Sequence, residues 1–194
     1  MERSVVLIKP DGIKRGLAGE IISRFEKAGL KIVAMKMVWI DKKFALKHYG
    51  YTDEWFENVG KRTKEFYQAQ GYDPGEEISK MANKEIGKLV QQWNVDYLTE
   101  GPVLAMILEG PEVVKIVRKM VGPTYPQDAP PGTIRGDYSF DSPLWSNQRR
   151  RSVYNLIHAS GKPEEAELEI QLWFKEGEIH KYQRVEELLM VGKE

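Results

Sequence analysis

The sequence contains no cysteine, so disulfide bridges and thiolate metal sites are excluded throughout its 194 residues. It has only three histidines, His48, His158 and His180, which leaves few candidates for chemistry at an imidazole. The 29 basic and 29 acidic residues cancel, and the chain therefore lacks the overall positive charge that favours binding to nucleic acid or to an anionic membrane. We expect neither nucleic acid nor membrane among its partners.

Long hydrophobic runs are also missing. The longest unbroken apolar run is residues 103–108, far short of the roughly 20 residues that a membrane-spanning helix needs. The first residues, Met1-Glu-Arg-Ser, have no signal-peptide pattern, and the expected location is the cytoplasm. With 41% hydrophobic residues, the chain is long enough to bury a sizeable core. We expect a single domain over residues 1–194.

The two best-known glycine-rich nucleotide motifs are absent as well. Neither G-x-x-x-x-G-K-[ST] nor G-x-G-x-x-G occurs. Any nucleotide bound by this chain must therefore be held by side chains rather than by a glycine loop.

The hydrophobic pattern predicts alternating strands and helices. Runs rich in β-favouring apolar residues predict four strands, at 4–9, 30–40, 103–109 and 154–158. Apolar residues at helical spacing predict helices at 18–28, 42–49, 111–121 and 163–174. Two βαβ units whose strands interleave into one antiparallel four-stranded sheet, with helices on one face, give an α+β ferredoxin-like βαββαβ sandwich.

Several polar side chains from distant parts of the sequence are expected to meet in this fold. Strand ends gather at one edge of a sheet, so Lys9 and His158 should be neighbours. Arg118 and Arg135 carry forked, permanently charged groups that suit phosphate binding. A lone histidine at a strand end is more often structural than catalytic. Its catalytic interpretation therefore depends on the residues around it.

Five motifs occur together in one order. They are Lys9-Pro-Asp-Gly12, Arg118 with Gly122-Pro-Thr124, Pro131-Gly-Thr-Ile-Arg-Gly-Asp137, Asn155-Leu-Ile-His-Ala-Ser160 and Glu169-Ile-Gln-Leu-Trp-Phe174. By these motifs the chain resembles the nucleoside diphosphate kinase family. The matching segments cover residues 1 to about 50 and 98 to about 175, and their joint occurrence is specific although each motif alone is weak.

The resemblance implies an activity and a mechanism. In that family a histidine takes the γ-phosphoryl group of a nucleoside triphosphate and passes it to a nucleoside diphosphate, with ping-pong kinetics. His158 occupies the position of that histidine. A largely neutral imidazole at pH 7 is a suitable nucleophile for this transfer.

The resemblance also assigns roles to the other motif residues. Glu169 would orient the imidazole, Lys9 and Asn155 would hold the ribose hydroxyls, and Tyr49 would lie near the transferred phosphate. The phosphates would be held by Arg118, Thr124 and Arg135. Mg²⁺ would be held through the nucleotide phosphates, because no carboxylate cluster with ligand spacing stands beside the motifs, and no protein-only metal site is expected. A homo-oligomer, most often a hexamer, is implied.

Two segments depart from the family pattern. Residues 52–93 form a first insertion, expected to be helical, and residues 138–152 form a second. Where the family has an aromatic and a leucine for the base, this chain has Val90 and Asn94. Phe66, Tyr67 or Trp93 could stack on the base instead, or could belong to the core.

Three further features leave alternatives open. The run Arg149-Arg-Arg151 could recruit substrate, lie in a solvated loop or contact another subunit. Gly161 stands where the family usually has aspartate, so the hydrogen bonding around His158 must differ. The tail, residues 175–194, should pack on its own domain or on a neighbouring subunit.

Two other functional classes compete with the kinase interpretation. A non-catalytic nucleotide-binding regulatory module could keep the same fold, although retention of His158 with its cationic neighbours argues against it. A nucleic-acid-binding domain of the ferredoxin-like type is disfavoured by the zero net charge.

Overall fold

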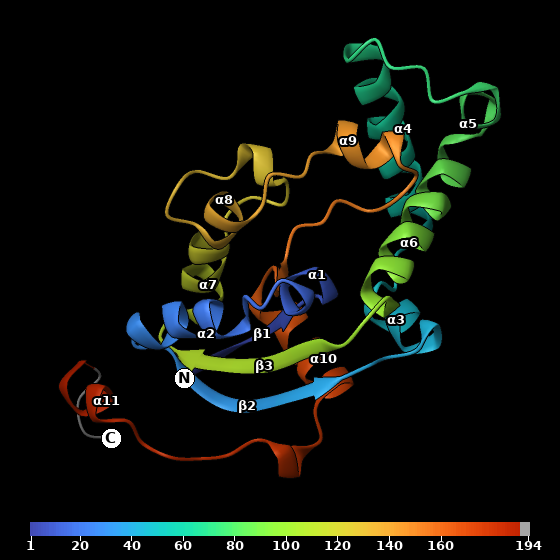
Figure 1. Cartoon of the computed structure of the whole chain (residues 1–194). Helices are drawn as coiled ribbons and strands as arrows, with labels where there is room; N and C mark the ends of the chain where they lie inside the picture. The colour runs from blue at the N-terminus through green and yellow to red at the C-terminus, as the bar shows by residue number, and fades with distance from the viewer. Residues whose placement is uncertain (191–194) are drawn as a thin grey trace.

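A computed structural model describes residues 1–190 and contains one antiparallel four-stranded sheet. Its strands are β1 (Glu2–Ile8), β2 (Lys31–Val38), β3 (Val103–Gly110) and β4 (Ile157–Ala159). They are arranged in the order β2-β3-β1-β4, which is the order of a ferredoxin-like sandwich (Figure 1). The predicted fold class is confirmed.

Helices cover both faces of this sheet. Val6 and Ile8 of β1 belong to a core shared with α2 (Ala18–Lys27) and α7 (Val113–Val121). Val5 and Leu7 point the other way, into a core shared with α3 (Lys42–His48), α6 (Asn83–Thr99) and α10 (Pro163–Trp173). The expectation of helices on one face only is therefore wrong. The unbroken apolar run of β1 reflects this two-sided burial, since a half-exposed strand would alternate.

The first inserted segment forms a helical hairpin that projects away from the sheet (Figure 1). It consists of α4 (Asp53–Ala69), the short α5 (Glu76–Lys80) and α6. Its outer end has a small core of its own, built around Tyr67, Ile78 and Ile86. α6 extends beyond the predicted limit of the insertion at residue 93 and reaches the main core through Val95 and Leu98.

Short helices and turns connect the longer elements around the sheet. α1 (Pro10–Lys14) begins directly after β1. The proline-rich loop contains a 3₁₀ turn, η1 (Pro126–Asp128), and α8 (Ile134–Tyr138). The second inserted segment contains α9 (Pro143–Gln148). β4 is shorter than the predicted strand 154–158, because the Ile157 N–H donates to the Asn155 carbonyl at 2.7 Å in a three-residue γ-turn.

The tail packs on its own domain, where it runs beside β2 (Figure 1). It contains a 3₁₀ turn, η2 (Glu176–Glu178), and α11 (Val185–Met190). The Lys31 ammonium of β2 lies 2.8 Å from Glu109 and 2.7 Å from Glu187 of α11. The last four residues of the predicted tail, 191–194, lie outside the described residues. None of the helices within residues 1–190 is both long and apolar enough to cross a membrane.

Candidate active site

A cleft of about 460 Å³ lies where the ends of β1 and β4 meet α7, α8 and the hairpin. Such a volume is typical of small-molecule sites. Seven of the eight predicted site residues line it: Lys9, Tyr49, Arg118, Thr124, Arg135, Asn155 and His158. The eighth, Glu169, is buried behind His158 and contacts it directly.

The orientation of the His158 ring is fixed by a buried carboxylate. Nε2 of His158 lies 2.6 Å from Oε1 of Glu169. The second oxygen of that carboxylate accepts a hydrogen bond from the Ser160 hydroxyl, also at 2.6 Å. A carboxylate accepts hydrogen bonds, so Nε2 carries the proton and the lone pair of the neutral ring is on Nδ1. The imidazole is therefore held as a nucleophile at Nδ1. Sequence reasoning assigned no role to Ser160.

A second histidine packs against the first. The rings of His48 and His158 meet edge to face, with centroids 4.7 Å apart. Nδ1 of His48 accepts the indole N–H of Trp173 at 3.3 Å, while its Nε2 is buried without a hydrogen-bond partner among the described residues. Burial, followed by the neighbouring His158 and Lys9, lowers the pKa of His48 well below its usual value. His48 is therefore a neutral residue packed against His158.

Lys9 is buried at the end of β1 and touches Asn155. Its ammonium donates to the Asn155 side-chain oxygen at 2.8 Å, and the Asn155 amide donates to the Thr124 carbonyl at 2.9 Å. Burial and the charge of Arg135 lower the pKa of Lys9 to about 7, although Asp11 opposes the shift. The predicted proximity of Lys9 and His158 is thereby realised across the β1–β4 pair, in which His158 lies opposite Leu7.

Arg135 lies beneath the cleft and organises its backbone. Its guanidinium donates to the carbonyls of Asn155, Gly122, Pro123 and Ile157. A guanidinium has five N–H groups, so these four bonds leave one for a ligand. Burial lowers the pKa of Arg135 to about 10.

Arg118 and Thr124 are exposed at the mouth of the cleft. The Arg118 guanidinium has no hydrogen bond or ion pair to any residue in the range 1–190. Its donors are therefore available to an anion in the cleft that His158 also lines.

Tyr49 is buried at the inner wall of the cleft, 8% exposed. Burial, and after it Tyr51 and Glu169, raise the pKa of its hydroxyl. The hydroxyl therefore stays protonated and can act only as a neutral hydrogen-bonding group.

The γ-turn that leads into β4 is held by residues that sequence reasoning did not single out. Leu156 has a φ of +65°, in the left-handed region that few residues with a side chain adopt. Its N–H donates to Asp11, whose other oxygen accepts the Tyr97 hydroxyl at 2.6 Å. In the sequence, Asp11 belongs to the motif Lys9-Pro-Asp-Gly12, but no role of its own was predicted for it. Strain held in this way is frequent at functional sites.

The outer end of the cleft is formed by the hairpin. Tyr51 and Trp55 stack with centroids 3.4 Å apart and line it, together with Val90 and Asn94. Trp93 also lines this end, whereas Phe66 and Tyr67 belong to the distant hairpin core. Of the three aromatic candidates for the base, only Trp93 therefore lies at the cleft, and sequence reasoning missed Trp55.

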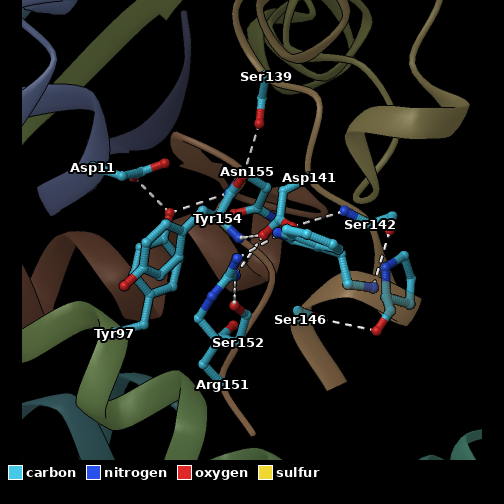
Figure 2. Close-up of polar contacts among 12 residues, drawn as sticks. Asp11, Tyr97, Ser139, Asp141, Ser142, Ser146, Arg151, Ser152, Tyr154 and Asn155 are labelled. Carbon is cyan, nitrogen blue, oxygen red and sulfur yellow. Dashed lines mark hydrogen bonds and ion pairs between the residues drawn. The ribbon is translucent and has the colours of Figure 1, made fainter. Parts of the chain in front are cut away.

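The second inserted segment closes the cleft on the same side. Figure 2 shows that Asp141 contacts both the Arg151 guanidinium and the Tyr154 N–H. Arg151 lines the cleft, but its charge is paired with Asp141 at 2.6 Å. Arg149 lies over the Trp145 ring, and Arg150 pairs with Glu77 of the hairpin at 3.5 Å. Each of the three arginines therefore has a different partner, and together they do not form a cluster of unpaired charges that could bind substrate.

Gly161 replaces the aspartate of the family pattern, and its backbone is hydrogen-bonded to the side chain of Glu165. The Gly161 N–H donates to the Glu165 carboxylate at 2.6 Å. Glu165 thus supplies a carboxylate to this position from the first turn of α10, and the expected difference from the family pattern remains a prediction.

One group of potential metal ligands exists among the described residues. It comprises His48, His158 and Glu169, whose ligand atoms lie within 4.8 Å of one another. Hydrogen bonds occupy Nε2 of His158, Nδ1 of His48 and both oxygens of Glu169. The expectation of no protein-only metal site remains a prediction.

Comparisons with known proteins agree on one family. The sequence model described as "Nucleoside diphosphate kinase" matches residues 2–69 and 75–179. A nucleoside diphosphate kinase of Pyrobaculum aerophilum is 49% identical over 179 residues, which are 92% of this chain and 98% of that protein. One of Pyrococcus furiosus is 46% identical over 182 residues, covering 94% of this chain and 88% of the relative.

Solved structures give the same result. An NDP kinase from Pyrobaculum aerophilum superposes with a TM-score of 0.88 at 47% identity, over 93% of this chain and 99% of the other. A transition-state mimic of the Borrelia burgdorferi enzyme, with bound vanadate and ADP, superposes with a TM-score of 0.79 at 35% identity, over 99% and 98% of the two chains.

Proposed function

The chain belongs to the nucleoside diphosphate kinase family and is a nucleoside diphosphate kinase, and we propose that Nδ1 of His158 carries the phosphoryl group between the two nucleotides. One observation carries this proposal. Glu169 engages Nε2 of His158 at 2.6 Å, which leaves the lone pair of Nδ1 free in a cleft lined by cationic side chains. A phosphoryl acceptor and the groups that neutralise phosphate are thus combined in one site.

The transfer has two matching halves. Nδ1 attacks the γ-phosphorus of the triphosphate, the bond to the bridging oxygen breaks, and the nucleoside diphosphate leaves with that oxygen. The second diphosphate then binds in the same cleft, and its terminal phosphate oxygen takes the phosphoryl group from Nδ1. The first half is thereby reversed on a different nucleoside, and the free imidazole is regenerated.

Positioning and charge provide most of the catalysis in such a transfer. Charge spreads over the equatorial oxygens of a loose transition state. Arg118, the remaining donor of Arg135 and Lys9 would stabilise that charge. Glu169 would stabilise the positive imidazole ring that forms on phosphorylation, and Tyr49 would offer its hydroxyl to the transferred phosphate.

Two further contacts complete the proposed nucleotide site. The pair Lys9 and Asn155 would bind the ribose hydroxyls, and Thr124 would bind a phosphate. The base would lie at the outer end, against Trp55 and Val90.

The residues of the site fit a magnesium ion that is held through the nucleotide. The nearest carboxylates are committed, Glu169 to His158 and Glu165 to Gly161, so phosphate oxygens and water would supply the ligands. When bound, Mg²⁺ neutralises phosphate charge and fixes the phosphate conformation.

The wider setting is also part of the proposal. Residues 1–194 form one domain with insertions near 52–93 and 138–152, acting in the cytoplasm without nucleic acid or membrane. A homo-oligomer, a hexamer as the resemblance implies, is supported by the edge strand β2 and the residue that follows it. Met35 and Met37 of β2 are 52% and 58% exposed, and Trp39 directly after β2 is 69% exposed. Light scattering of the purified protein measures the assembly.

The proposal is tested by tracing the phosphoryl group. The protein is incubated with γ-labelled ATP and magnesium, separated from nucleotide, and then mixed with GDP. We expect acid-labile, base-stable label on the wild type that moves to GTP, no label on His158→Ala, and wild-type labelling of the matched control His180→Ala. Label retained by His158→Ala would refute the assignment. Absence of label on every protein would favour a nucleotide-binding module without catalysis.

A further inference from the structure

The second inserted segment contains a buried carboxylate that receives four hydrogen bonds. Asp141 accepts two hydrogen bonds from the terminal nitrogens of Arg151, at 2.6 and 3.3 Å. It accepts two more from the backbone N–H groups of Tyr154 and Ser142, at 2.7 and 3.0 Å (Figure 2). The Asp141 side chain is only 8% exposed. A charge buried to this extent is tolerated because these four hydrogen bonds are directed at it. Asp141 therefore fixes the inserted segment to the residue that precedes Asn155.

Arg151 is also the outer layer of a four-membered stack. Its guanidinium carbon lies 4.3 Å from the centre of the Tyr154 ring, and the Tyr154 ring stacks on Tyr97 with centroids 4.7 Å apart and planes at 21°. The Lys9 ammonium lies 4.8 Å from the centre of the Tyr97 ring. Two aromatic rings are thus enclosed between two cations, an arrangement in which each cation is attracted by the ring face beside it.

Both the ring stack and the Asp141 carboxylate help to position Asn155. The stack does so through Tyr97, and the carboxylate does so through Tyr154. The Asn155 N–H donates to the Tyr97 hydroxyl at 3.2 Å. The carbonyl of Tyr154, directly before it, accepts the Ser139 hydroxyl at 2.8 Å. The Asn155 side-chain oxygen in turn accepts a hydrogen bond from the Lys9 ammonium. Displacement of Tyr154 would therefore move Asn155 and Lys9 together.

We propose that Asp141 and Arg151 are positioning residues of the nucleotide site, which hold Tyr154 so that Lys9 and Asn155 meet the ribose hydroxyls. This inference rests on the proposed function, because it uses the ribose role of Lys9 and Asn155. It gives the second insertion a part in catalysis without any direct contact of these two residues with the phosphates.

The test compares two acceptors that differ in one hydroxyl. For Asp141→Asn, whose amide keeps the shape and loses the charge, we expect kcat/KM for GDP to fall about tenfold, the equivalent of one charge-assisted hydrogen bond. The fall should lie mainly in KM. The value for 3′-deoxy-GDP, which keeps the 2′-hydroxyl and lacks the 3′-hydroxyl, should change less than about twofold if the 3′-hydroxyl is the group that Lys9 and Asn155 position. Discrimination between the two acceptors is then lost.

Matched variants separate positioning from general damage. Arg151→Gln should reproduce Asp141→Asn, and it also tests the inference should Asp141→Asn not fold. Arg149→Ala removes the same charge from the same segment without touching Tyr154, and should leave both acceptors at wild-type values. Tyr154→Phe keeps the stacked ring and should retain most of the discrimination, whereas Tyr154→Leu should lose it.

A phosphoryl donor without a nucleoside tests the chemistry apart from the ribose. Phosphoramidate passes its phosphoryl group to an imidazole and releases ammonia. We expect wild type and Asp141→Asn to be labelled at His158 at equal rates. Failure of wild type to be labelled there would refute the phosphohistidine proposal instead.

Other outcomes overturn the positioning inference alone. Equal losses with GDP and 3′-deoxy-GDP would mean that Asp141 supports the fold in general. Unchanged discrimination in Asp141→Asn and Arg151→Gln would mean that the clamp does not reach the ribose site, and so would a wild type that does not distinguish the two acceptors.

Discussion

Glu169 contacts His158 on the side of the ring opposite to Nδ1, with 2.6 Å between its Oε1 and Nε2. The carboxylate is 7% exposed, and its second oxygen is occupied by the Ser160 hydroxyl. The pair therefore determines both which nitrogen of His158 is free and how the ring is turned. A strand residue and a helix residue, eleven positions apart, together form the proposed nucleophile.

Replacing the carboxylate should slow phosphorylation of His158. In Glu169→Gln the phosphorylated ring loses its anionic partner, and a charge-assisted hydrogen bond of about 1.5–3 kcal/mol corresponds to a roughly 10- to 150-fold slower step. Ser160→Ala removes a neutral donor and should slow the step about fivefold. Rapid-quench labelling by γ-labelled ATP measures both rates. Equal rates in Glu169→Gln and wild type would contradict the orienting role.

Nucleotide binding should take up a proton above pH 7. Burial lowers the pKa of Lys9 to about 7, so its ammonium is largely neutral in the free protein at pH 8. Anionic phosphates favour the charged form and raise that pKa again. Affinity for ADP should therefore weaken as the pH rises above 7. Titration calorimetry in buffers of different ionisation enthalpy should detect the proton, and Lys9→Met should abolish it. A heat of binding independent of the buffer would contradict this expectation.

The same lysine should make folding stability depend on pH. The pKa of Lys9 is lower in the folded chain than its ordinary value of 10.5, so the unfolded chain binds more protons between pH 7 and 10.5. The contribution of Lys9 to stability therefore becomes more favourable as the pH rises through this window. Lys9→Met should stabilise the protein more at pH 6 than at pH 9. Urea denaturation at the two pH values measures the difference, and a larger gain at pH 9 would contradict the assigned shift.

The hairpin should depend on two glycines at which its helices touch. A Cβ at Gly60 would lie 1.8 Å from the Asn83 carbonyl oxygen, and one at Gly87 would lie 2.2 Å from the Phe56 carbonyl oxygen. Because these obstacles are backbone atoms, Gly60→Ala and Gly87→Ala should separate α4 from α6 and cost about 1–3 kcal/mol. The KM for nucleotide should also rise, since Trp55 and Asn94 line the cleft.

Thermal unfolding followed by circular dichroism measures this cost. Gly19→Ala is the matched control, because it lies in α2 with nothing within 4 Å of the added carbon. Helix propensity should make that control neutral or more stable by up to about 1 kcal/mol. Wild-type melting in both hairpin variants would refute the close helix contact.

The described part of the tail, residues 175–190, should detach from β2 when the Lys31 side chain is removed. The Lys31 side chain is 8% exposed between Glu109 and Glu187, and it also donates to the Tyr182 carbonyl. Lys31→Met leaves these groups without their cation, which should cost about 3 kcal/mol and expose the tail to trypsin. Lys36→Met, which breaks the more exposed pair with Glu178, should have a smaller effect. Equal protease resistance of wild type and Lys31→Met would contradict the anchoring role.

Much of the site could be predicted because its residues lie at the ends of locally recognisable elements. Lys9 follows a buried strand, His158 lies in a short apolar segment and Glu169 lies on an apolar-faced helix. Antiparallel pairing of β1 with β4 then brings Lys9 and His158 to one edge. The conformation of Asn155 to Ile157 could not be predicted, because the positive φ of Leu156 depends on Asp11, a residue distant in sequence.

The sequence by itself determined the order of the four strands, the candidate nucleophile His158 and the family, since each follows from local pattern or from motifs along the chain. Only the tertiary structure decided that helices cover both faces of the sheet, that Arg151 is paired with Asp141, and that Tyr97 stacks on Tyr154. A charged run in a loop has the same sequence whether it is solvated or neutralised. Its role is set by which distant carboxylate and ring the folded backbone places beside it, and that information is three-dimensional.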